Sequence, residues 1–175
     1  KGAGMYNRNA SPQILECDFI QNSTGIGGLS ARHSGDGGNA GDGAGICSVN
    51  SSVTIADCRF TENQTGRGGL AYRESGGTGG ISGRGGHGAG IFSNNSPTTL
   101  TRCTFRGNRT GDGGRANSAG FCYDALLTRD GASGGDAGSG AGICSVGGSL
   151  SMVACSFVSN QTGSGASGGN GAPGM

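Results

Sequence analysis

The chain has 175 residues, of which 42 are glycine and none is tryptophan, and the hydrophobic set AVILMFWYC makes up only 32%. Glycine at this density disfavours a helical globule, because each glycine costs a helix about 1 kcal/mol relative to alanine. Twelve basic residues nearly balance 11 acidic ones, so the formal net charge is +1 and no nucleic-acid binding is expected. Because no apolar run reaches the ~18 residues of a membrane span, we expect no membrane insertion.

The chain contains four copies of a 24-residue pattern that align without gaps and begin with Gly-Ala-Gly. The copies span residues 2–25, 43–66, 88–111 and 140–163. Three glycine-rich inserts of 17, 21 and 28 residues separate them, at 26–42, 67–87 and 112–139. Self-similarity at a fixed period is typical of stacked repeat architectures, so we expect residues 1–175 to form one repeat domain.

Equivalent positions of the copies hold the same kinds of side chain. Cys17 and Phe19 are two residues apart and therefore lie on the same face of an extended strand. Ile14 is three residues before Cys17, which interrupts the alternation and predicts a bend near Glu16 and, in the next copy, near Asp57. We expect the aromatic column to form a core ladder through all copies: Phe19, Phe60, Phe105 and Phe157.

Short strands joined by bends, with like residues stacking from copy to copy, predict an all-β fold, a right-handed parallel β-helix. The glycine-rich inserts have two interpretations. Each is a loop that leaves a helix of four coils, or a degenerate coil that carries an extended glycine arc. The similar restarts GIGGL and GRGGL favour the second interpretation. Glycine also allows extended segments similar to polyproline II to pack closely.

A GAGM or GAGI element followed by F-x-x-N occurs in every copy, for example from Phe19 to Asn22 and from Phe60 to Asn63. This pairing resembles the repeats of the polymorphic outer membrane protein family. Members of that family are β-helical surface adhesins, and many are autotransporter passengers. The resemblance implies a β-helical fold and an extracellular or cell-surface location.

Seven cysteines suggest disulfides. Three bridges are candidates: Cys47–Cys58, Cys144–Cys155 and Cys103–Cys122, with Cys17 left over. Alternatively, the cysteines are small buried hydrophobic residues in a ladder. Simple alternation would place Ile46 inside and Cys47 outside, which argues against the bridge unless the chain turns there. Both interpretations stay open.

Seven asparagines lie in N-x-S/T sequons, in two groups. One column is either an internal ladder of amide hydrogen bonds or a set of glycosylation sites, and we favour the ladder: Asn22, Asn63, Asn108 and Asn160. The other group is expected in a turn before an SS or SP step and offers better glycan acceptors: Asn9, Asn50 and Asn94.

Signals for catalysis or metal binding are weak. The triplet Gly86-His87-Gly88 resembles a short polygalacturonase motif, but its companion motifs are absent. The carboxylates fall in columns that face outward. Asp18 lies in the column of Arg59, and Glu16 and Asp57 lie in the column of Arg102, so we expect solvated ion pairs between copies. The chain has no C-x-x-C and its histidines are isolated, so we expect no metal, no cofactor and no catalytic residues.

These observations favour a non-catalytic, extracellular structural segment of a cell-surface fibre or adhesin, decorated with glycans. Open strand edges at the ends of a β-helix can pair with another copy, so we expect end-to-end self-association into a filament. One alternative is an adhesin passenger domain that binds a cell-surface receptor or a glycan. A second alternative is a polysaccharide-degrading β-helix enzyme.

Overall fold

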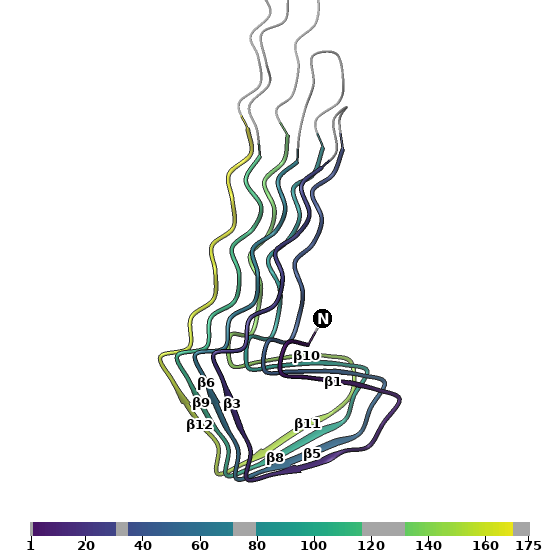
Figure 1. The fold of residues 1–175 in the computed structure, drawn as a ribbon, viewed down its shortest axis with the longest axis vertical. Helices are drawn as coiled ribbons and strands as arrows, with labels where there is room; N and C mark the ends of the chain where they lie inside the picture. The colour runs from purple at the N-terminus through teal and green to yellow at the C-terminus, as the bar shows by residue number, and fades with distance from the viewer. Residues whose placement is uncertain (1, 31–34, 72–79, 117–131, 170–175) are drawn as a thin grey trace, which may run out of the picture.

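The computed structural model describes residues 2–30, 35–71, 80–116 and 132–169 (Figure 1). Over these ranges the chain is all-β, with twelve strands and no helix. The strands form three parallel sheets of four, and each sequence copy contributes one strand to each sheet. The three sheets make the sides of a triangle when the molecule is viewed along the stack (Figure 1).

The strands are short, and equivalent strands of the four copies are neighbours. The first sheet has the order β1 (Met5–Arg8), β4 (Ile46–Val49), β7 (Ile91–Asn94) and β10 (Ile143–Val146). The second has the order β11 (Leu150–Val153), β8 (Thr98–Thr101), β5 (Val53–Ala56) and β2 (Gln13–Leu15). The third has the order β12 (Ser156–Val158), β9 (Thr104–Arg106), β6 (Arg59–Thr61) and β3 (Asp18–Ile20).

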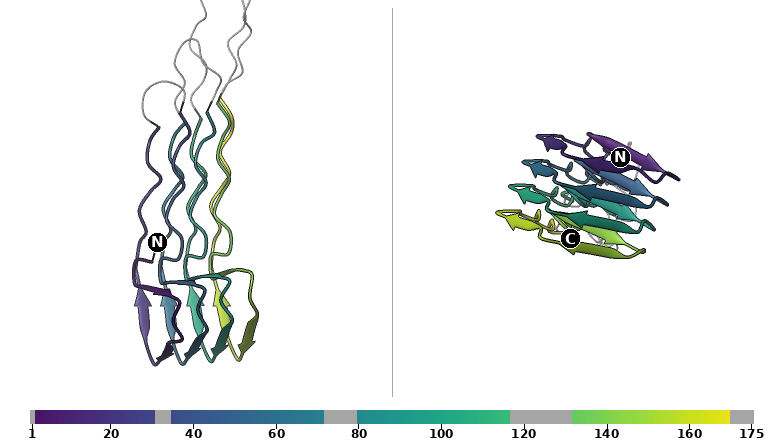
Figure 2. Two further views of the ribbon diagram at one scale, coloured as in Figure 1. Left: turned by 90° about the vertical axis from the view of Figure 1, so that its right-hand side faces the viewer. Right: turned by 90° about the horizontal axis from the view of Figure 1, so that it is seen from below.

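Strand pairing keeps the copies in register. Ile14 pairs with Ile55, and Phe19 pairs with Phe60, so equivalent residues lie directly above one another. Figure 2 shows the four layers of strands from the side and from below. This register follows from the absence of gaps between copies, because a shift of one residue would turn every side chain to the opposite face.

The bends between the strands use residues in the left-handed conformation. The predicted bend is confirmed by φ values of 51° at Glu16 and 56° at Asp57. At the preceding corner, φ is 52° at Asn9 and 50° at Asn50. Asparagine tolerates this region better than most residues, whereas glutamate is held there by the sheets on either side.

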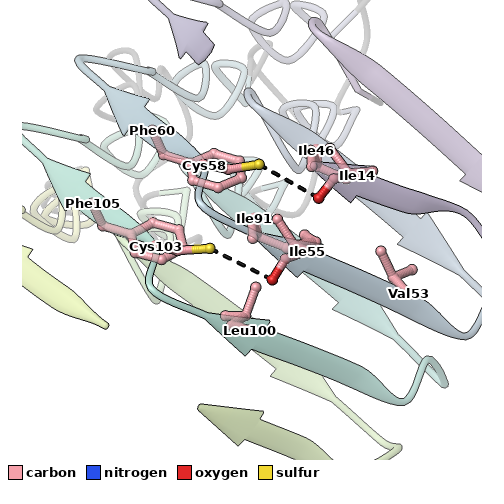
Figure 3. Close-up of a cluster of buried hydrophobic side chains, with 10 residues drawn as sticks. All are labelled: Ile14, Ile46, Val53, Ile55, Cys58, Phe60, Ile91, Leu100, Cys103 and Phe105. Carbon is pink, nitrogen blue, oxygen red and sulfur yellow. Dashed lines mark hydrogen bonds between the residues drawn. The ribbon is translucent and has the colours of Figure 1, made fainter. Parts of the chain in front are cut away.

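The interior of the triangle holds the hydrophobic core. Figure 3 shows buried side chains from all three sheets pointing toward one another. The cluster comprises Ile14, Ile46, Val53, Ile55, Cys58, Phe60, Ile91, Leu100, Cys103 and Phe105. The predicted phenylalanine column stacks through all four copies, with ring centroids 4.9, 4.7 and 4.8 Å apart and planes within 4° of parallel. Burial of one such ring contributes about 1.5–3 kcal/mol.

The glycine-rich inserts extend away from the triangle as long arms (Figure 1). We call the segments that leave the third sheet the outgoing arms: 25–30, 66–71, 111–116 and 163–169. We call the segments that lead back to the first sheet the returning arms: 35–43, 80–88 and 132–140. The arms run side by side in the views of Figures 1 and 2.

Backbone hydrogen bonds hold the arms in two layers. Neighbouring outgoing arms are joined by bonds such as that from Gly27 N to Arg67 O, at 2.8 Å, and neighbouring returning arms are joined likewise. The two layers are joined by bonds such as that from Gly83 N to Gly69 O, at 2.9 Å. The arms therefore satisfy much of their backbone hydrogen bonding without forming strands of the sheets.

Glycine is required where the arms touch. A Cβ added to Gly69 would lie 2.0 Å from the carbonyl oxygen of Gly28. Ile26 and Leu29, three residues apart in the first outgoing arm, are exposed instead, at 63% and 67%. Polyproline II has three residues per turn, so two glycines in three can face neighbouring arms while the third residue faces solvent. The expected close packing of extended glycine segments is thus confirmed.

The interpretation of the inserts as degenerate coils is wrong for the residues that the structure describes. The inserts contribute none of the twelve strands and make only isolated bridges, such as Ala71 to Ala116. The physical reason is that glycine offers no side chain to fill the interior of the triangle, whereas it allows arms to approach one another closely.

We expect the substitution Gly69→Ala to lower the free energy of unfolding by about 1–3 kcal/mol, because the added methyl group overpacks the arms. Chemical denaturation of the purified chain measures the change.

Gly28→Ala is the matched control, since Gly28 occupies the equivalent position in the first arm and a Cβ there meets no atom within 4 Å. We expect this variant to be neutral or more stable by up to about 1 kcal/mol. Equal destabilisation by both substitutions would contradict the packing argument.

Candidate functional site

The asparagine column forms a ladder of hydrogen bonds along the inner edge of the stack. Asn63 Nδ2 donates to Asn108 Oδ1 at 2.9 Å and to the carbonyl oxygen of Phe19 at 2.8 Å. The backbone N–H of Asn63 donates to the same Asn108 Oδ1 at 3.0 Å. Equivalent side-chain bonds join Asn22 to Asn63 and Asn108 to Asn160, each at 2.8 Å. All four residues of the column are therefore brought together.

Burial in the ladder limits access to these sequons. Asn63 and Asn108 are 0% exposed, and Asn22 and Asn160 are half-buried. A glycosyltransferase needs an exposed amide, so the folded chain offers poor acceptors in this column.

The second sequon group lies at the corner between the first and second sheets. Asn9 and Asn50 are exposed in the left-handed corner position, which suits an acceptor. Asn94 differs, because it is half-buried inside β7 and the corner position is taken by Asn95, with φ 47°. Glycosylation of Asn9, Asn50 and Asn94 stays a prediction, with Asn94 placed less favourably than the other two.

A threonine column joins the triangle to the arms. Thr65 Oγ1 donates to the carbonyl oxygen of Gly86 in the returning arm at 2.6 Å. It also accepts from the backbone N–H of Gly111, which begins the next outgoing arm, at 2.9 Å. Thr110 makes the same contacts one copy further on. These hydroxyls fix where both layers of arms start.

Two of the predicted disulfides are wrong. Cys58, Cys144 and Cys155 carry free thiols, so neither Cys47–Cys58 nor Cys144–Cys155 is formed. Ile46 packs in the core, and its neighbour Cys47 lies on the other face of the first sheet, whereas Cys58 is inside the triangle. The sheet thus separates the two sulfurs.

The cysteines of the inner column behave as small buried residues. Cys58 Sγ donates to the carbonyl oxygen of Ile14 at 3.6 Å (Figure 3) and also to that of Ala56 at 3.1 Å. Burial raises the pKa of the Cys58 thiol and that of Cys103, so both are poor nucleophiles. The third predicted bridge involves Cys122, which lies outside the described residues.

Three polar side chains of the returning arms, Asp42, Arg84 and His87, lie close together near the triangle, and we call this group the polar seam. Arg84 donates two hydrogen bonds to Asp42, at 2.8 and 3.1 Å, and the side chain of Asp42 is only 6% exposed. Burial opposes ionisation of Asp42, but hydrogen bonds from Arg84 and from the His87 amide outweigh it and lower the pKa of this carboxyl. This pair was not predicted from the sequence. The only available signal is that glycine is absent at every third position of the arms, and both residues occupy such a position.

His87 belongs to the same polar seam and joins two returning arms. Its Nδ1 accepts a hydrogen bond from the backbone N–H of Ser139 at 2.8 Å, and its ring stacks on Phe92 at 6.2 Å. Burial and the charge of Arg84 lower the pKa of His87, against the opposing effect of Asp42. The imidazole is thus held neutral as an acceptor.

The exposed carboxylates form the predicted ion pairs between copies. Arg59 donates to both oxygens of Asp18, at 2.6 and 2.5 Å, and Arg102 donates to both oxygens of Asp57, at 2.7 and 2.6 Å. The hydrogen bonds from the arginines lower the pKa of both carboxyls. These carboxylates are consequently engaged along the stack rather than gathered around a cleft.

No group of three or more His, Cys, Asp or Glu residues that could hold a metal ion occurs in 2–30, 35–71, 80–116 or 132–169. Over the same ranges, no helix has the length and apolar character needed to cross a membrane.

Comparison of the chain with protein-family models, with curated proteins and with solved structures finds no match.

Replacing the ladder residue Asn63 by alanine leaves the carbonyl of Phe19 and the donors of Asn22 without their partner. We expect Asn63→Ala to lower the free energy of unfolding by about 1–3 kcal/mol, the cost of unsatisfied buried polar groups. Gln64→Ala, at the exposed neighbouring position, should change it by less than about 0.5 kcal/mol. Urea denaturation of both variants measures the difference, and comparable losses would argue against the ladder.

The pKa of His87 is lower in the folded chain than its ordinary value of 6.5, so the unfolded chain binds the proton more readily. The stability that depends on neutral His87 is therefore complete above about pH 6.5 and declines as the pH falls toward the folded-state pKa. We expect the denaturation midpoint to drop between about pH 7 and pH 5 in the natural chain and less in His87→Gln. An identical pH profile of the two proteins would refute this role of His87.

Proposed function

We propose that the chain is a non-catalytic structural repeat segment of an extracellular fibre or cell-surface adhesin. In this proposal it is a right-handed parallel β-helix whose copies stack end to end, within one chain and between chains. The observation that carries the proposal is the copy-to-copy contact itself, which occurs three times in the same register and buries the same columns each time.

The β-helical interpretation is supported by the order of the strands. Each copy visits the three sheets in sequence and then passes to the next layer, as a coil of a solenoid does. Connections between parallel strands of one sheet are right-handed in about 98% of cases, which favours the right-handed form.

End-to-end stacking is supported by the face of the fourth copy. Met152 belongs to the column of Ile55 and Leu100, which are 0% exposed, yet it is itself 47% exposed. Phe157, in the column of Phe60 and Phe105, is likewise 47% exposed. A further copy placed on this face would cover both side chains with the contact that already joins the other layers. Because each is already about half buried, each would gain roughly half of the about 1.5–3 kcal/mol that complete burial contributes.

The two end faces have complementary polarity in the asparagine ladder. The first three asparagines each donate from the backbone N–H and Nδ2 to the Oδ1 of the next copy. Among the described residues, Asn22 Oδ1 receives no such donor and the backbone N–H of Asn160 has no such acceptor. Head-to-tail stacking brings these two groups together, whereas head-to-head stacking does not.

A non-catalytic role is supported by the engagement of the candidate groups. The carboxylates of Asp18, Asp42 and Asp57 are each paired with an arginine, and His87 accepts a backbone hydrogen bond. The exposed corner sequons at Asn9 and Asn50 support an extracellular location with glycans.

A receptor- or glycan-binding adhesin is the second candidate. The outgoing arms favour it, because they present several side chains to solvent on a closely packed frame: Ile26, Leu29, Arg67 and Arg115. Binding to cells or to a glycan array would support this role, and the structural role requires neither.

Sedimentation velocity and electron microscopy of the purified chain test the assembly. We expect particles that grow with concentration in steps of the 16.9 kDa chain. Met152→Glu should abolish growth, because it places a charge on the face that stacking buries.

Val153→Glu is the matched control, because Val153 is the next residue of β11, lies on its outer face and is 58% exposed. This variant should still assemble. A chain that stays monomeric at all concentrations, or equal effects of the two substitutions, would overturn end-to-end stacking.

A further inference from the structure

The layer of returning arms has an open position beside the last outgoing arm, 163–169. Elsewhere in the arms, a returning arm lies beside each outgoing arm and donates to it. Gly83 N donates to Gly69 O at 2.9 Å, and Gly86 N donates to Gly66 O at 3.0 Å. The fourth copy has the same outgoing arm, but the described residues contain no returning arm beyond it.

Carbonyl groups at this edge are the equivalents of those that bind a returning arm. Ala166 O corresponds to Gly69 O, and Gly163 O corresponds to Gly66 O. Within the described part of the chain neither oxygen accepts a backbone hydrogen bond. Their spacing of three residues matches the period of the arms.

The last returning arm, 132–140, supplies donors at the same edge. In the earlier arms, N–H groups at every third position donate to the next returning arm, as Ala40 N does to Arg84 O at 3.0 Å. The equivalent N–H groups of the last arm have no acceptor among the described residues: Gly134, Ala137 and Gly140. Donors and acceptors therefore line two sides of one position.

The hydroxyl of Thr162 completes the set. Thr65 and Thr110 each donate to a carbonyl oxygen of the returning arm of their own copy, at 2.6 and 2.7 Å. Thr162 holds the same place in the fourth copy, is exposed, and has no such acceptor in the part of the chain that the structure describes.

We propose that this edge is a binding site for one extended strand of a partner chain in which every third residue is glycine. The strand lies parallel to the last returning arm and antiparallel to the last outgoing arm. It donates to Ala166 O and Gly163 O and accepts from Gly134, Ala137 and Gly140. This site does not depend on end-to-end stacking of the triangle.

Selectivity for glycine follows from the existing contacts between returning arms. A Cβ on Gly135 would lie 2.0 Å from Gly83 O, and one on Gly138 would lie 1.9 Å from Gly86 O. A strand with side chains at these positions cannot approach closely enough to form the backbone hydrogen bonds. An exposed residue between these glycines, as Ile81 is in its own arm at 61%, is free to vary.

The test uses the nonapeptide GISGRGGHG, which copies residues 80–88. Isotope-labelled 175-residue chain carrying Met152→Glu, which should be monomeric, is titrated with unlabelled peptide to about 10 mM, a range that detects weak binding. We expect shifts of the amide signals of Gly134, Ala137 and Gly140, and amide exchange slowed about tenfold at saturation.

Two control peptides and two chain variants define the outcome. The peptide with Gly83→Ala and Gly86→Ala should not bind, whereas the peptide with Ile81→Ala should bind as the original does. Thr162→Val in the chain should weaken binding several-fold, and the exposed Ser164→Ala should not.

Absence of binding by the original peptide, equal binding of the alanine-blocked peptide, or signal changes confined to residues outside 132–140 and 162–169 would overturn the site. The titration uses a chain that should not stack, so its failure would count against the strand-binding site and not against end-to-end stacking. Failure of the assembly experiment would likewise count against stacking and not against this site.

Discussion

Parallel pairing in register between equivalent residues is the constraint on which the structure depends. Phe60 lies between Phe19 and Phe105, and Asn63 lies between Asn22 and Asn108, because each strand pairs with its own equivalent. Side chains alternate along a strand, so an offset of one residue would carry the core to the outside. The four copies consequently tolerate substitutions in solvent-facing columns but no insertion.

The triangle and the arms avoid empty space between backbone segments in opposite ways. Inside the triangle, space between the sheets is filled by rings and branched side chains such as Phe105 and Leu100. In the arms, the space is removed, because glycines such as Gly69 let backbones touch directly. Both parts repeat from copy to copy through hydrogen bonds between equivalent residues, and the hydroxyl of Thr65 bonds to both layers of arms at the point where they start.

Much of the triangle could be predicted from the sequence, because stacked copies need the same kind of side chain at equivalent positions, so the pattern is seen four times. The phenylalanine stack and the bend at Glu16 are examples. The path of the arms could not, since glycine has no side chain whose pattern reveals what it contacts. The three-residue period within GIGGL and GRGGL was the available signal, and it is short. The Asp42–Arg84 pair depends on the offset between neighbouring arms, which no pattern within one copy contains.

The inserts differ in length, at 17, 21 and 28 residues, although their arms keep one register. Hydrogen bonds join equivalent residues from the triangle outward, so the difference in length falls beyond the paired parts of the arms. Residues can therefore be gained or lost far from the triangle without displacing any column of the core. The 24-residue copies, which must stay constant, are thus separate from the outer parts of the inserts, which can diversify. Related chains can acquire new sequence there without any change to the triangle.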